Sequence, residues 1–137
     1  MWKAIMGMLG GMILSLTLGI EVNAQQAEIE GTISSQIEAF KSDDFEQAFT
    51  YATPNLQRLF QSPANFQRMV TQGYPMVSRP AEVQYLELQE RAGDQFQKVR
   101  ITDQKGMIHL LLYRMQQTEA GWRIGGVQIL KVPGATA

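Results

Sequence analysis

Hydrophobic residues recur with helical spacing in the segment from residue 27 to residue 72. Steps of four, four and three residues place the first apolar side chains on one side of an amphipathic helix. This stripe consists of Ile29, Ile33, Ile37 and Phe40. Polar residues, Gln36 among them, are assigned to the opposite, solvated face. The first predicted element is therefore a helix whose isoleucine stripe belongs to the core.

Turn and capping residues divide the rest of this segment into shorter helices. Asp43 is expected to cap the next helix, with Glu46 reaching back as in a capping box. Because proline favours the first position of a helix, two further short helices are predicted, over 54–60 and 64–72. Two prolines and a glycine within residues 73–80 predict an irregular loop.

After residue 80 the hydrophobic pattern alternates with a period of two, which is typical of β-strands. Short polar or glycine-containing segments separate four such runs, and three successive hairpins would form an antiparallel meander. The predicted strands are 81–91, 95–103, 106–117 and 121–130. Gly125 and Gly126 lie inside the last strand and predict a bulge that bends the sheet.

The third predicted strand is apolar on both faces. One face would carry Met107, His109, Leu111, Tyr113 and Met115. The other would carry Ile108, Leu110, Leu112 and Arg114. Two apolar faces are typical of a central strand that is covered twice. The helices would cover one face, and either a second copy of the chain, as a homodimer, or a curved sheet closing over a pocket would cover the other.

Helices followed by an antiparallel meander predict an α+β fold, with the N-terminal helices packed on a curved antiparallel sheet. The helices would occupy the concave side of this sheet. Such a cone leaves an apolar pocket between its two layers. A small apolar ligand is therefore one expected partner, and a second copy of the chain is the other.

The N-terminal residues have the pattern of a secretory signal peptide. A basic residue near the start precedes an apolar run over 4–20, and cleavage is expected between Ala24 and Gln25. The alternative is an uncleaved membrane anchor, because a run of about 17 apolar residues is at the short limit for a membrane span. The prediction is a signal peptide at 1–24 and a single exported domain at 25–137, periplasmic or secreted.

Composition and charge exclude several classes of function. The 137 residues include 12 Lys and Arg against 13 Asp and Glu, which argues against a basic nucleic-acid-binding face. The absence of cysteine excludes disulfides, thiolate metal sites and a cysteine nucleophile. With a single histidine, a multi-histidine metal site is also excluded. No metal or cofactor is predicted, and contact with a membrane is expected only if the N-terminal segment stays uncleaved.

Particular strings resemble known families. The isoleucine-striped helix with IEAFKSDDFEQAF and the closing strand GWRIGGV resemble the nuclear transport factor 2-like (SnoaL-like) superfamily. The strings ATPNLQRLF, NFQRMVTQGYPMV and RPAEV resemble more closely a bacterial family known as domain of unknown function 4864. The resemblance covers about residues 28–131 and implies a cystatin-like or nuclear transport factor 2-like cone and an exported protein. It implies no activity, because the closer family has none assigned.

Four residues are candidates for a site in the pocket. His109 lies in mid-strand among apolar neighbours, where it is either an acid or base of the pocket or a packed, half-buried ring. Tyr113 shares its strand face, Tyr85 lies on the first strand, and Tyr74 could form a lid or plug. The leading hypothesis is a non-catalytic ligand-binding or interaction domain, because the third strand is apolar on both faces. Acidic residues fall mostly at strand ends and in turns, which counts against an enzyme. The alternative is a small-pocket dehydratase or isomerase that uses His109.

Overall fold

The computed structural model describes residues 23–131, and the predicted signal segment up to residue 22 lies outside the described residues. Helix covers residues 23–41. Four short helices follow: α2 (Phe45–Phe49), α3 (Pro54–Phe60), α4 (Pro63–Gly73) and α5 (Pro75–Ser78). Four strands complete the described chain: β1 (Pro80–Arg91), β2 (Asp94–Asp103), β3 (Ile108–Thr118) and β4 (Gly121–Leu130). They form one antiparallel sheet in the order β1-β2-β3-β4, which confirms the predicted meander.

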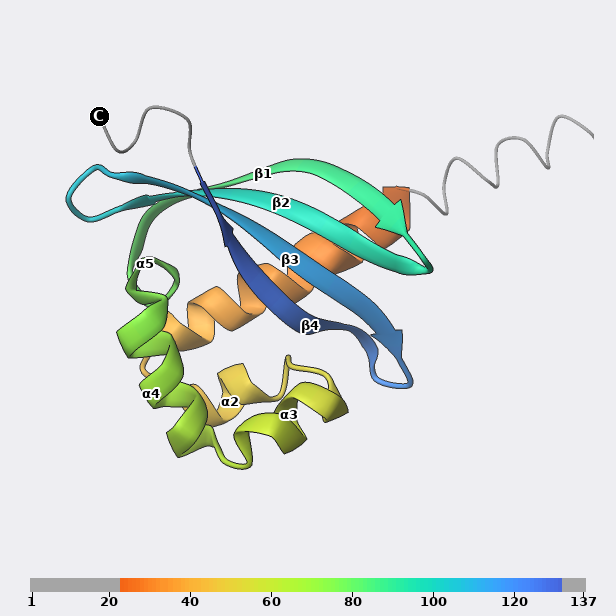
Figure 1. Cartoon of the computed structure of the whole chain (residues 1–137), viewed down its shortest axis with the longest axis horizontal. Helices are drawn as coiled ribbons and strands as arrows, with labels where there is room; N and C mark the ends of the chain where they lie inside the picture. The colour runs from red at the N-terminus through yellow and green to blue at the C-terminus, as the bar shows by residue number, and fades with distance from the viewer. Residues whose placement is uncertain (1–22, 132–137) are drawn as a thin grey trace, which may run out of the picture.

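The helices lie on one side of a twisted sheet. In Figure 1 the helix over 23–41 crosses one face of the sheet, with α2, α3 and α4 on the same side. The isoleucine stripe predicted from the sequence is buried, as are the inward-facing residues of β2, β3 and β4. The sheet contributes Val99, Ile101, Leu111, Tyr113, Met115, Trp122 and Ile124 to this core. The α+β fold with N-terminal helices on a curved antiparallel sheet is confirmed.

The residue that caps α2 is Asp44, so the prediction of Asp43 as the cap was wrong. The Asp44 side chain accepts from the Gln47 N–H. Asp43 has a φ of 57° and belongs to the end of the preceding helix, where the Asp44 N–H bonds back to the Ala39 carbonyl. This is the left-handed termination that often ends helices, usually with glycine. The sequence pattern assigned to Asp43 the capping role that Asp44 has in the structure.

The segment 73–80 is more regular than the predicted loop. Helix α4 extends through Gly73, and Pro75 opens the single turn of α5. Proline suits this position because its fixed φ is already helical and its missing N–H would be unpaired there. Tyr74 lies between the two helices as the cap residue of both. This placement turns its ring toward the sheet.

Strand β4 bends at a bulge, as the paired glycines predicted. Arg114 pairs with Gly126 and Met115 pairs with Ile124, so Gly125 is the extra residue. Next to the bulge, residues 51–53 pair with the outer edge of β4, which has no neighbouring strand. The Thr53 N–H donates to the Ile124 carbonyl at 2.9 Å, and the Ile124 N–H donates to the Tyr51 carbonyl at 2.8 Å.

The two faces of β3 are covered unequally. On the inner face Leu111, Tyr113 and Met115 are fully buried beneath the helices. On the outer face Leu112 is only half-buried and Ile108 is 42% exposed. Within residues 23–131 only the helical cover is present, and the homodimer stays a prediction. No helix in this part of the chain is both long and apolar enough to cross a membrane.

The capping assignment predicts a difference between two neighbouring aspartates. Asp44→Ala should lower the free energy of unfolding by about 1 kcal/mol, because the Gln47 N–H loses its acceptor. Asp43→Asn is the matched control, since asparagine tolerates the left-handed conformation. It removes an exposed ion pair with Arg79, which contributes less than about 1 kcal/mol. Urea unfolding measures both changes, and an equal or larger loss in Asp43→Asn would contradict the assignment.

Candidate functional site

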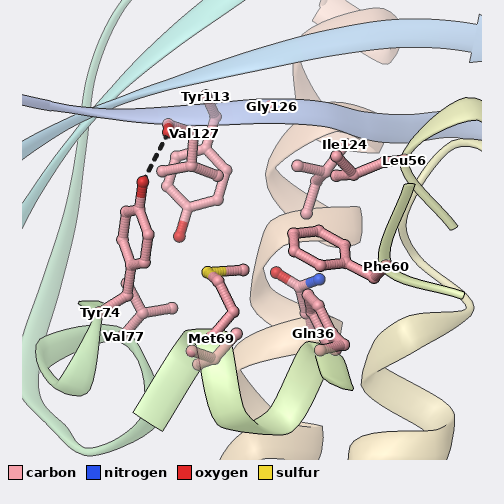
Figure 2. Close-up of a pocket in the computed structure, with 12 residues that line it drawn as sticks. Gln36, Leu56, Phe60, Met69, Tyr74, Val77, Tyr113, Ile124, Gly126 and Val127 are labelled. Carbon is pink, nitrogen blue, oxygen red and sulfur yellow. Dashed lines mark hydrogen bonds between the residues drawn. The ribbon is translucent and has the colours of Figure 1, made fainter. Parts of the chain in front are cut away.

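A cavity of about 320 Å³ lies between the sheet and the helices. Its lining, most of which is labelled in Figure 2, comes from the first helix, α3, α4, the turn at α5 and the strands β3 and β4, and the cavity is partly open to solvent. Nine of its twelve lining residues have apolar side chains or are glycine. They are Leu56, Phe60, Phe66, Met69, Val70, Val77, Ile124, Gly126 and Val127. The other three are Gln36, Tyr74 and Tyr113, and none of the twelve carries a charge.

Tyr113 reaches the cavity from the inner face of β3. Its side chain is fully buried, and its hydroxyl has no hydrogen-bond partner among the described residues. Figure 2 shows this hydroxyl pointing away from the sheet, toward Met69 on α4. Burial first, and then the neighbouring Tyr85 and Tyr74, raise the pKa of Tyr113 above its ordinary value. The hydroxyl is therefore protonated at neutral pH and available as a donor.

The other two polar side chains of the lining are held by backbone carbonyls. Tyr74 donates to the Val127 carbonyl at 3.1 Å, which ties the α4–α5 junction to the free edge of β4. The Gln36 Nε2 donates to the Ala48 carbonyl at 3.2 Å. Both bonds join segments that are distant in the sequence. They hold the wall of the cavity in place and use donors that would otherwise face an apolar space.

The lining offers little chemistry beyond binding. It contains no carboxylate, imidazole or amine that could accept a proton in a reaction. Its side chains supply one free hydroxyl donor within an apolar surface. Among residues 23–131, no three His, Asp or Glu side chains lie close enough together to hold a metal ion. The arrangement suits a small uncharged molecule.

Two of the four predicted site residues share this cavity, and two do not. Tyr74 and Tyr113 line it together. Tyr85 packs against the first helix instead, with its hydroxyl 2.5 Å from the Ser34 Oγ. His109 lies near the β2–β3 turn, where its Nε2 is 2.8 Å from the Asp103 Oδ2. Tyr85 and His109 are therefore separate from the cavity that Tyr74 and Tyr113 line, and a binding role for these candidates stays a prediction.

Sequence reasoning missed Gln36, which is 4% exposed and not on a solvated face. A signal for its burial was present, because Gln36 lies three residues after Ile33 and four before Phe40. Those steps belong to the apolar stripe itself. A polar side chain at a stripe position must find a partner inside, and here the partner is the Ala48 carbonyl. Long-range contacts alone place Leu56 and Phe60 in the lining.

The carboxylate beside His109 closes the β2–β3 turn. The Asp103 Oδ1 accepts from the backbone N–H groups of Lys105 and Met107, both at 2.9 Å. The His109 ring first, and then the Met107 N–H, hold the pKa of the Asp103 carboxyl below its ordinary value. This pairing places His109 in the β2–β3 hairpin, and His109 does not line the cavity.

The family described as Domain of unknown function (DUF4864) matches residues 22–137. No curated protein matches the sequence significantly. Among solved structures, the chain is similar to an NTF-2 like protein of unknown function from Burkholderia xenovorans LB400. The two share 12% identity with a TM-score of 0.46, over 80% of this chain and 91% of that one.

The Asp103–His109 pair predicts a specific dependence of stability on pH. Since the pKa of Asp103 is lower in the folded chain than its ordinary 3.8, ionised Asp103 stabilises the fold above that value. This contribution is lost as the pH falls through the lowered value. Urea unfolding between about pH 2 and pH 6 should therefore show a shallower acid-induced loss in Asp103→Asn than in the wild type.

A second variant separates the histidine from the rest of the turn. His109→Gln removes the ring that lowers the pKa of Asp103 most. The free energy of unfolding should therefore fall less steeply with falling pH than in the wild type, as in Asp103→Asn. Slopes identical to the wild type in both variants would show that the pair does not contribute.

Proposed function

The chain belongs to the family described as Domain of unknown function (DUF4864), and we propose that it is a non-catalytic domain that binds a small, mostly apolar molecule. The cavity between sheet and helices carries this proposal. Protein interiors contain few voids larger than a water molecule, because each void forfeits packing energy. A largely apolar pocket of about 320 Å³ that reaches the core and is partly open to solvent has a ready explanation as a binding site.

The composition of the lining supports binding over catalysis. An acid–base enzyme needs a titratable side chain within hydrogen-bond reach of its substrate. The residues around the cavity include two tyrosines and a glutamine but no histidine or acid. His109, the base in the alternative dehydratase or isomerase hypothesis, pairs with Asp103 at the hairpin instead. We therefore favour a domain that holds its ligand without converting it.

Export is the second part of the proposal. A basic start, an apolar run over 4–20 and the small residue Ala24 support a cleavable signal peptide that delivers the domain to the periplasm or the medium. An exported binding domain without cysteines depends on packing alone, so a ligand that fills its core would also stabilise it.

The cavity proposal predicts opposite results for two leucines of α3. Leu56 lines the cavity, whereas Leu59 is 74% exposed to solvent. Leu56→Trp should abolish binding of naphthalene, an apolar probe, because the indole occupies the space; Leu59→Trp should leave binding unchanged. Isothermal titration calorimetry on the full-length variants measures the affinity for naphthalene. Native mass spectrometry reports any ligand retained from the host and the number of chains in the assembly. Failure of the wild type to bind naphthalene or any other small apolar molecule would overturn the proposal.

The export proposal predicts the mass of the product. In a bacterial host with a working export pathway, the intact mass should equal that of residues 25–137. Ala24→Arg should block this processing, because the cleavage site needs a small residue. A full-length product in the membrane fraction of the wild type would instead support the uncleaved anchor.

A further inference from the structure

We propose that the ligand of this cavity is uncharged and carries a carbonyl or hydroxyl oxygen that accepts a hydrogen bond from Tyr113. This inference rests on the proposed function, because it specifies the chemistry of the molecule that the cavity holds. The observation that carries it is a buried hydroxyl without a partner among the described residues, on a ring that lines the cavity.

A buried hydroxyl without a partner is costly, because it has lost water and gained nothing in return. Native proteins pair nearly all such groups, so an exception calls for an explanation. The Tyr113 ring enters from a central strand and is fixed by the core around it. Figure 2 shows its hydroxyl pointing away from the sheet, between Tyr74, Val77 and Met69. A ligand oxygen that reaches the hydroxyl by displacing one of these side chains would supply the missing acceptor.

The other hydroxyl of the lining is already used, and so is one N–H of the Gln36 amide. The Tyr74 hydroxyl donates to the Val127 carbonyl, and the Gln36 amide donates to the Ala48 carbonyl. Tyr113 is therefore the hydroxyl in the described lining that is free to select a ligand group. A free hydroxyl in a mostly apolar wall is suited to a molecule with an acceptor oxygen on an apolar body.

The absence of charge from the described lining specifies the ligand further. A carboxylate or phosphate in the cavity would be buried without a cationic partner, and an ammonium would be buried without an anion. Burial holds the pKa of the Tyr113 hydroxyl high, so this group supplies a neutral donor and not a charge. Ketones, esters and alcohols meet these conditions, whereas a compound whose charged group must lie inside the cavity does not.

The volume sets the size of the probes. The cavity of about 320 Å³ is roughly twice the ~150 Å³ of an engineered cavity that holds one benzene. Two fused rings therefore fit the space. Naphthalene, 1-tetralone and 1-naphthoate have the same carbon framework, or nearly so, and differ in the polar group: none, a neutral carbonyl and an anion.

Calorimetry with these three probes tests the inference on the full-length protein. The wild type should bind 1-tetralone roughly three- to tenfold more tightly than naphthalene, the value of one neutral hydrogen bond. 1-Naphthoate should bind more weakly than either. In Tyr113→Phe the preference for the ketone over naphthalene should disappear. Because an unpaired hydroxyl is removed, the variant should melt no lower than the wild type.

A spectroscopic measurement on the wild type is independent of the variant. The carbonyl stretch of bound 1-tetralone should shift to lower wavenumber than in an alkane solvent, as expected for an accepted hydrogen bond, and the shift should vanish in Tyr113→Phe. Binding of naphthalene without any gain for the ketone, or a ketone preference that survives Tyr113→Phe, would overturn this inference and leave the proposed function intact. Tighter binding of 1-naphthoate than of 1-tetralone would also overturn it. Failure of every probe to bind would count against both.

Discussion

The structure depends on one backbone junction between its two layers. Two hydrogen bonds join Ile124 on β4 to Tyr51 and Thr53, the chain between α2 and α3. They cover the edge of β4 immediately before the Gly125 bulge. On the other side of the bulge, the hydroxyl of Tyr74 contacts the Val127 carbonyl. The helical layer is therefore attached to the same strand at two separated points, and the cavity lies in the interval between them (Figure 2).

This arrangement explains how a small domain keeps a cavity without collapse. Backbone groups need partners, and the junction at Ile124 supplies them for the edge of β4 at this point. Aromatic rings provide a second rigid element: Phe66 packs against Phe40, Phe49 and Phe60 with ring centroids 5.4–5.8 Å apart. Phe66 is the centre of this cluster, because it contacts all three of the other rings. The wall of the cavity is thus stiff, and a donor such as Tyr113 keeps its direction.

Local patterns predicted much of the fold because the physics behind them is local. The isoleucine stripe, the strand alternation and the paired glycines of β4 all appear in the structure where their periods and conformational preferences indicated. The errors occurred where two local rules compete. Asp43 and Asp44 both suit a cap, and the choice between them depended on how the preceding helix ends. Gln36 was assigned by its polarity, although its spacing within the stripe pointed to burial.

The sequence by itself determined the order of helices and strands, the class of fold, the resemblance to a family and the exclusion of thiolate and multi-histidine chemistry. These follow from composition and from spacings of a few residues. The tertiary structure alone decided which rings meet. Tyr74 and Tyr113 come together across the sheet and the helices, while Tyr85 turns to the first helix and His109 to the Asp103 carboxylate. Alternation along a strand tells which residues share a face, but strand length, twist and the bulge decide which point of that face lies above the cavity.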